Sequence, residues 1–112
     1  MKSETKEKNT VNLQGKQKSF LRGLGHQLEP VVYLGKEGLT DNVVKAAREA
    51  CKTRELIKVK LGQNCALPAE EAAISLSELI GAAVVQRIGR TLLLYRPNKK
   101  LKPEQRIILP KD

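Results

Sequence analysis

The feature that most constrains the fold of this chain is the alternation of short strand-like segments with amphipathic helix-like segments. Read along the chain, the order is helix, strand, helix, strand, helix, strand, strand, over residues 15–27, 31–34, 40–54, 56–61, 68–80, 83–88 and 91–96. Strands separated by helices pair in parallel through right-handed crossovers, which places both connecting helices on one face of the sheet. The last two strands are joined by Gly89-Arg90, with glycine first as a type II′ hairpin turn requires. The sequence therefore predicts an α/β two-layer sandwich, α-β-α-β-α-β-β, with a four-stranded mixed sheet.

Hydrophobic periodicity indicates which residues form the core. In the first helix, the apolar residues at helical spacing are Phe20, Leu21, Leu24 and Leu28. Residues 31–34 are apolar without alternation, as expected for a strand buried on both faces. We therefore expect Phe20 and Tyr33 in the core, which leaves no aromatic platform for stacking nucleic-acid bases. Residues 56–61 do alternate, and the polar face of this strand is cationic, with Lys58 and Lys60.

The tetrad Gly35-Lys36-Glu37-Gly38 lies between the strand at 31–34 and a helix for which Thr40 is a good N-cap. Glycines at such a turn let the backbone approach a ligand, and a helix N-terminus presents unpaired N–H groups that suit a phosphate. Lys36 adds a mobile positive charge. Glycines after a strand also commonly do no more than close a turn, so the tetrad alone leaves both interpretations open.

The charge of the chain is strongly positive and unevenly distributed. There are 21 Lys and Arg against 12 Asp and Glu, a formal net charge of +9. Residues 61–86 contain no Lys or Arg and carry −3, so the remainder carries +12. This predicts a basic side that faces a polyanionic partner and an acidic side, on the third helix, that faces away. The alternative is a generic basic surface that keeps the protein soluble.

At 112 residues the chain has room for one domain, with a disordered tail at residues 1–12 and a basic tail at 98–112. The apolar cluster at 107–109 could pack on the domain or on a partner. No run of apolar residues is long enough to span a membrane, and the N-terminus lacks a signal sequence, so we expect a cytoplasmic protein.

The sequence has few residues that could act as catalytic groups or metal ligands. His26 is the single histidine, and Cys51 and Cys65 are too far apart for a CxxC pair, so Cys and His cannot supply a four-ligand zinc site. We interpret both cysteines as reduced, with Cys51 in the core. There is no nucleophile–base set and no P-loop, so we expect a non-enzyme without metal, cofactor or small-molecule substrate.

Four stretches together resemble the YhbY family, whose domain is also called the CRM domain. They are LQGKQKSFLR at 13–22, PVVYLGKEGLT at 30–40, ELIKV at 55–59 and VQRIGRTLLLYR at 85–96, and the resemblance covers residues 13–97. It implies an RNA-binding module similar in fold to the C-terminal domain of translation initiation factor three, with sheet order 1-2-4-3 and a GxxG loop reminiscent of KH domains. Stand-alone bacterial members resemble ribosome-associated factors that act on large-subunit precursors, and a single copy is typical of that kind.

The resemblance carries an RNA-binding role to the tetrad by position. The candidate RNA-binding residues are Gly35, Lys36, Glu37, Gly38, Lys16, Lys18, Arg22 and Arg90. We expect the three helix cations to flank the tetrad, Arg90 to be held at a hairpin tip, and Glu37 to face solvent or pair with a cation. His26 is interpreted as a partly buried residue at a helix end. Lys45, Arg48 and Lys52 share one helix face, and whether they face RNA or solvent stays open.

The function predicted is that of a monomeric RNA-binding factor in ribosome assembly that binds ribosomal RNA of large-subunit precursors. The alternative is a protein-interaction module that docks on an acidic partner or a ribosomal protein. DNA binding would rely on the same electrostatics.

Overall fold

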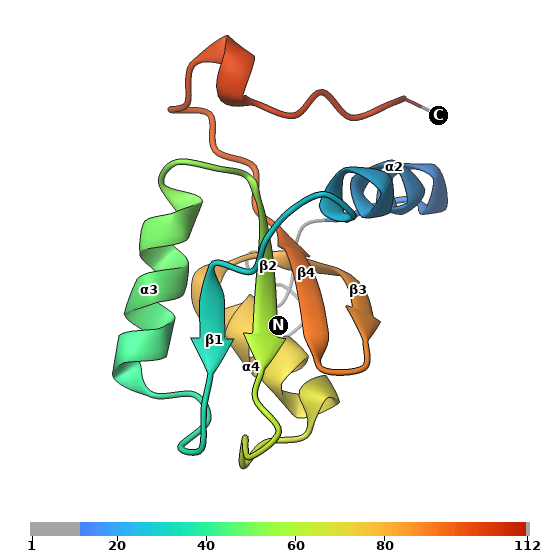
Figure 1. The fold of residues 1–112 in the computed structure, drawn as a ribbon. Helices are drawn as coiled ribbons and strands as arrows, with labels where there is room; N and C mark the ends of the chain where they lie inside the picture. The colour runs from blue at the N-terminus through green and yellow to red at the C-terminus, as the bar shows by residue number, and fades with distance from the viewer. Residues whose placement is uncertain (1–11, 112) are drawn as a thin grey trace, which may run out of the picture.

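The sheet and its connecting helices follow the predicted order. The computed structural model describes residues 12–111 (Figure 1). Its elements are α2 (Gly15–Gly25), β1 (Val32–Leu34), α3 (Asp41–Cys51), β2 (Leu56–Leu61), α4 (Ala69–Ile80), β3 (Ala83–Ile88), β4 (Thr91–Tyr95) and a short 3-10 helix, η1 (Pro103–Gln105). The prediction of a disordered tail falls, except for Asn12, outside the described residues.

The four strands form one mixed sheet in the order β1-β2-β4-β3. β1 pairs in parallel with β2, while β4 is antiparallel to both β2 and β3. The predicted mixed sheet is thus confirmed, and the strand order is the one that the family resemblance implies.

Local signals account for the ends of several elements. The Thr40 hydroxyl accepts a hydrogen bond from the Val43 N–H at 3.2 Å and so caps α3. Gly81 ends α4 in the left-handed conformation, with φ of 70°. Gly89 has φ of 57°, and no residue other than glycine has positive φ among those described, which agrees with glycine at the first position of a type II′ turn. Pro68 precedes α4 as its N-cap and does not lie within its first turn.

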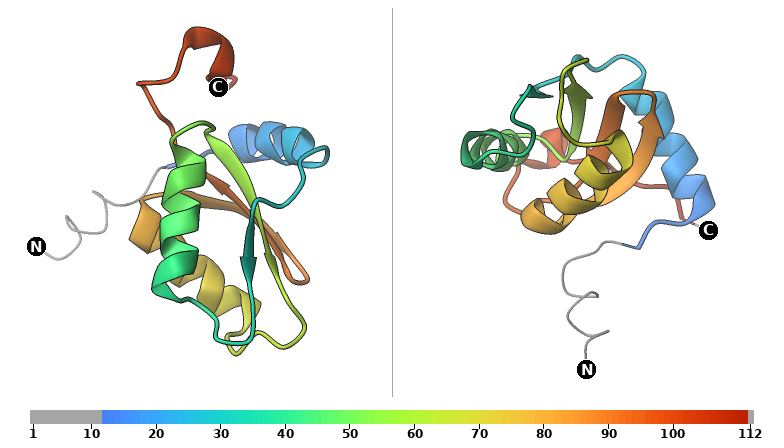
Figure 2. Two further views of the ribbon diagram at one scale, coloured as in Figure 1. Left: turned by 60° about the vertical axis from the view of Figure 1, so that its left-hand side comes forward. Right: turned by 90° about the horizontal axis from the view of Figure 1, so that it is seen from below.

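The larger core lies between the sheet and the two connecting helices. α3 and α4 cover the same face, as the crossover rule predicts (Figure 2). Leu34, Val59, Leu76, Leu92 and Leu94 are among the buried side chains of this core. Cys51 belongs to it as predicted; burial raises the pKa of its thiol, and Arg96 and Arg54 offset part of that rise.

A second, smaller core lies on the opposite face of the sheet, where α2 packs. Its buried residues are Leu21, Leu56, Val85, Leu93 and Tyr95. Burial raises the pKa of the Tyr95 hydroxyl, and the nearby Glu55 raises it further. α2 approaches the sheet closely because Gly25 has no side chain: a Cβ there would lie 2.6 Å from a Leu93 methyl carbon. α2 thus adds a partial layer on this face of the sheet, opposite the face that α3 and α4 cover.

The C-terminal segment packs on this second core. Ile107 and Leu109 lie against it, so two of the three apolar residues at 107–109 pack on the domain itself, while Ile108 between them is 84% exposed. The buried carboxylate of Glu55 accepts hydrogen bonds from the Asn98 and Ile107 N–H groups, both at 2.6 Å, and from Arg106 Nε at 3.0 Å. One side chain, immediately before β2, therefore fastens both ends of the segment 98–107.

Four core predictions are wrong. Leu24 and Leu28 are 40% and 37% exposed, so Leu21 is the one buried residue of the apolar set expected for the first helix. Phe20 is exposed, because α2 turns Leu21 toward the sheet and its neighbour away from it. Tyr33 is 62% exposed, because β1 alternates: Val32 and Leu34 face α3, while Tyr33 points to the other face of the sheet, which α2 does not reach there. The apolar run at 31–34 therefore belongs to an edge strand that is covered on one side.

Two negative findings apply to the described part of the chain. No helix there is long and apolar enough to cross a membrane. No group of three or more His, Cys, Asp or Glu residues is arranged there to hold a metal ion.

Candidate nucleic-acid interface

The Gly35–Gly38 turn leads from β1 into α3. The Gly38 N–H donates to the Gly35 carbonyl at 3.0 Å, and the Thr40 N–H donates to the Gly38 carbonyl at 3.1 Å. Gly38 has φ of 72°, which a glycine adopts without strain. Two successive tight turns thus reverse the chain before the helix begins.

The outer part of this turn presents free backbone donors. Gly35, Lys36 and Glu37 are exposed. Within residues 12–111, the N–H groups of Lys36 and Glu37 have no hydrogen-bond partner. Glu37 has no ion-pair partner in the same range, so its carboxylate faces solvent. Together with the positive end of α3, the turn has the geometry of an anion site with one mobile cation beside it.

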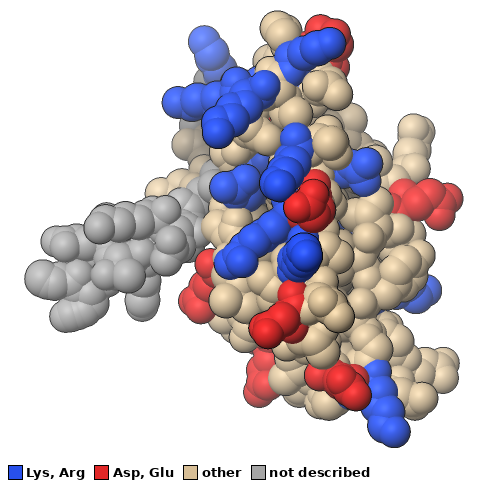
Figure 3. All heavy atoms as spheres, turned by 90° about the vertical axis from the view of Figure 1, so that its left-hand side faces the viewer, with Lys and Arg blue, Asp and Glu red and all other residues tan. Residues whose placement is uncertain are grey.

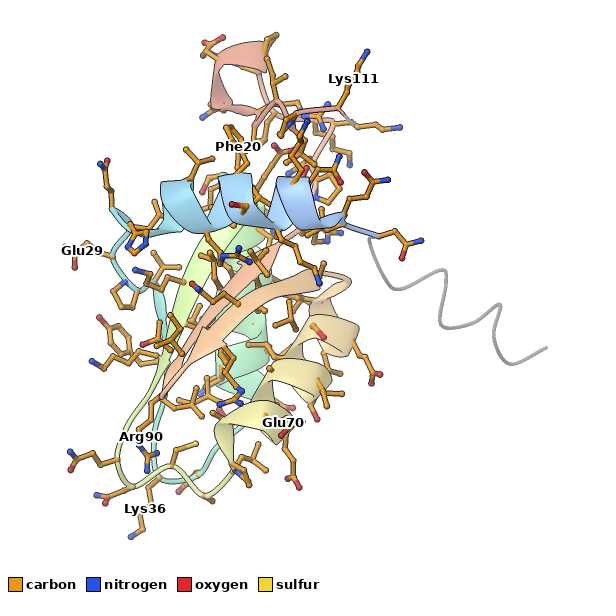
Figure 4. The ribbon with its side chains drawn as sticks, turned by 90° about the vertical axis from the view of Figure 1, so that its right-hand side faces the viewer. Phe20, Glu29, Lys36, Glu70, Arg90 and Lys111 are labelled. Carbon is orange, nitrogen blue, oxygen red and sulfur yellow. The ribbon has the colours of Figure 1, made fainter. Side chains whose placement is uncertain are left out.

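Arg90 lies at the same end of the sheet as Lys36 (Figure 4). The Gly62 N–H donates to the Leu34 carbonyl at 2.8 Å, which joins the ends of β1 and β2. Arg90 Nη1 in turn donates to the Gly62 carbonyl at 3.1 Å. The hairpin tip is exposed as predicted, and the guanidinium is held beside the loop that follows β2.

The expectation that Lys16, Lys18 and Arg22 flank the turn is wrong. α2 crosses the opposite end of the sheet from Lys36 (Figure 4). Lys16 Nζ donates to the Lys111 carbonyl at 3.4 Å, so the start of α2 lies against the C-terminal segment. The packing of Leu21 on the second core sets this position, which helix periodicity does not specify. RNA contact by these three cations stays a prediction, at a site separate from the turn.

A further cationic strip runs along α3. Figure 3 shows Lys and Arg side chains gathered over this helix and the C-terminal segment above it, with acidic side chains among them. Lys52 pairs with Glu49 at 3.0 Å, and Arg48 Nη2 donates to the Leu79 carbonyl at 2.9 Å. Two of the three candidate cations on this face therefore have partners within the protein.

The side of α4 that faces away from the sheet is acidic, with Glu71 and Glu78 exposed. Changing both to Gln is expected to alter RNA affinity by no more than about twofold, because charges farther from bound phosphate than a Debye length of about 8 Å are largely screened. Binding titrations at physiological salt check this. A large change in either direction would place α4 at the interface.

Sequence reasoning missed a row of residues across the sheet face that α2 leaves uncovered. Strand register aligns Tyr33 with Lys60, Lys60 with Thr91, and Thr91 with Ile88. We call this set the open row. The alternation of residues 56–61 identified Lys60 as solvent-facing, but nothing local aligned Tyr33 and Ile88 with it.

Beside the open row, toward α2, lies a hollow of about 220 Å³. Its lining is Arg22, Gly25, His26, Lys58, Gln86, Ile88, Thr91 and Leu93. His26 is exposed on this hollow and not partly buried as expected. Two cations, Arg22 and Lys58, thus border the open row on its α2 side.

Comparison with known proteins finds a family whose domain covers these residues. Residues 13–96 match the CRS1 / YhbY (CRM) domain family. The "Probable RNA-binding protein YqeI" of Bacillus subtilis is 43% identical over 90 residues, which cover 80% of this chain and 94% of that protein. An "RNA-binding protein" of Haemophilus influenzae is 42% identical over 92 residues, covering 82% and 93%.

Among solved structures, the chain is similar to the hypothetical protein SAV1595 from Staphylococcus aureus. The TM-score is 0.74 at 39% identity, and the match covers 88% of this chain and 100% of that one. The family match spans the turn, the four strands and all three helices described above. On this evidence the chain belongs to the CRS1 / YhbY (CRM) domain family.

Proposed function

We propose that this protein binds RNA without catalysing a reaction, and that its target is ribosomal RNA of large-subunit precursors during ribosome assembly. The observation that carries RNA binding is the family match over residues 13–96 to relatives that are named RNA-binding proteins. The finer target rests on the resemblance of a single-copy chain to ribosome-associated family members.

The geometry of the turn supports a role in phosphate contact. Its exposed N–H groups, the start of α3 and the Lys36 ammonium converge on one end of the sheet, and Arg90 lies at that same end. Hydrogen bonds from backbone N–H groups and cations to phosphate position an RNA without reading its sequence. The net charge of +9 adds the long-range attraction that such binding requires.

Lys36→Ala is expected to remove about one phosphate contact. The slope of log affinity against log salt concentration should then fall by about 0.7 to 0.9, because one fewer counterion is released. RNA titrations at several salt concentrations measure this. Lys36→Arg is the matched control, since it keeps a positive charge at the same exposed position and should keep the slope.

Gly35→Asp tests the backbone part of the site. Gly35 has no atom within 4 Å of a Cβ and no positive φ, so the fold should tolerate the change while an anion repels phosphate. Gly38→Asp is a poorer test, because Gly38 is buried with positive φ and the variant would be strained. If Gly35→Asp keeps full affinity, the turn is only a structural turn. If the unmodified protein fails to bind RNA at low salt, the proposal is wrong and an acidic protein partner is favoured.

A further inference from the structure

The open row combines the two kinds of group that bind unpaired nucleotides. Tyr33 and Ile88 are 62% and 61% exposed at its two ends, and the exposed Lys60 lies between them on β2. Three strand spacings of about 4.8 Å each make the row about 14 Å long. Figure 1 looks onto this face, where α2 crosses one end of the sheet and leaves the other end free.

The fold explains why this row is bare. Side chains on the α2 face form successive rows two residues apart along each strand. The first contains Leu56 and Tyr95, which are buried under α2 and the C-terminal segment. The second row contains Lys58 and Leu93. Gly25, the last residue of α2, lies close against Leu93, and α2 covers the sheet no farther than this row. The open row is the third, and no described element packs over it.

The charge around the row is of one sign. Lys58 and Arg22 line the adjoining hollow, and Lys60 is in the row itself. Neither the open row nor the lining of the hollow includes an Asp or Glu among the described residues. Glu29 borders a separate depression at the β1 edge, together with Val31 and Lys58. A cationic surface with an exposed aromatic ring complements a flexible polyanion that carries flat bases.

We propose that the open row is a second RNA subsite, which binds an unpaired RNA segment. One base of this segment stacks on Tyr33, and the phosphates of the segment lie near Lys60 and Lys58. This inference rests on the proposed function and adds the form of RNA bound. The Gly35–Gly38 turn and Arg90 lie at the end of the sheet where β1 and β2 finish. A single RNA strand could therefore contact both the turn and the open row. The RNA class that fits is therefore a single-stranded loop or bulge beside a paired region, since A-form duplex does not expose its bases for stacking.

The test compares a short unstructured oligouridylate with a fully paired RNA duplex of the same strand length, at fixed salt. Tyr33→Ala is expected to weaken oligouridylate binding roughly 5- to 150-fold, the range found when an aromatic stacking partner is removed, and to leave duplex binding unchanged. Tyr33→Phe keeps the ring and should stay within about twofold of the unmodified protein. Ile74→Ala, which removes an exposed apolar side chain from α4 on the other face, is the matched control.

Tyrosine fluorescence supplies an independent readout. The chain has no tryptophan and two tyrosines, of which Tyr95 is only 3% exposed. Oligouridylate should quench the fluorescence of the unmodified protein and of Tyr95→Phe, but not the residual fluorescence of Tyr33→Phe. Quenching that persists in Tyr33→Phe would overturn the assignment of the stacked residue.

The outcomes separate the two proposals. If the unmodified protein binds RNA with a steep salt dependence and Tyr33→Ala binds oligouridylate equally well, the subsite is wrong and the proposed function stands. Equal weakening for oligouridylate and duplex would also overturn the subsite. A dimer in sedimentation that Tyr33→Ala dissociates would show that a second copy of the chain covers the row. If the unmodified protein binds neither RNA, both proposals fail.

Discussion

Glu55→Ala is expected to lower the free energy of unfolding by about 2 to 4 kcal/mol, because it leaves the partners of a buried carboxylate without an acceptor. Glu55 is 1% exposed and accepts from two backbone N–H groups and from Arg106. Arg106 is partly exposed and can be hydrated after the change. The N–H groups of Asn98 and Ile107 are half-buried and account for most of the loss.

Urea unfolding of Glu55→Ala beside Glu49→Ala measures this effect. Glu49 forms an exposed pair with Lys52, the C-cap residue of α3, and such pairs contribute about 0 to 1 kcal/mol. The Glu55 change should also free the C-terminal segment, so that protease cleaves within residues 98–107 before the domain unfolds. Equal stability of the two variants would show that the segment is not fastened through Glu55.

Leu21→Ala is expected to destabilise the protein by about 2 to 5 kcal/mol, the usual cost of removing a fully buried leucine side chain. Leu21 is fully buried between α2 and the sheet, beside Leu93 and Tyr95. Leu24→Ala is the matched control, since it makes the same change on the same helix at a residue that is 40% exposed. Its cost should be under about 1 kcal/mol.

Thermal and urea unfolding of the two leucine variants measure the difference. α2 places Arg22 at the hollow beside the open row, and His26 follows directly after the helix. Partial loss of α2 packing in Leu21→Ala should therefore also weaken oligouridylate binding, while the turn still binds phosphate. Two variants of equal stability would contradict the position of α2 on the sheet.

Local features of the sequence determined the element order and most element ends. Thr40, Gly81 and the Gly89-Arg90 turn act through contacts within a few residues, so their effects can be predicted from neighbours along the chain. The alternation of residues 56–61 likewise predicted which face of β2 carries Lys58 and Lys60, because side chains alternate with a period of two in any strand. The Gly35–Gly38 turn was identified for the same reason, since a strand, two glycines and an N-cap are adjacent in sequence.

Only the tertiary structure decided where these elements meet. Helix periodicity identifies an apolar stripe on α2, but it does not specify that Leu21 is buried while Leu24 is exposed. Nor does it specify that Lys16 lies beside Lys111 and far from the turn. The hydrogen bond from Ile107 to Glu55 joins residues 52 apart in sequence, and no local pattern specifies such a pair. Tyr33 is exposed because strand register and the position of α2 together leave one row of the sheet uncovered. Burial of a side chain depends on what packs over it, and that is a property of the assembled fold.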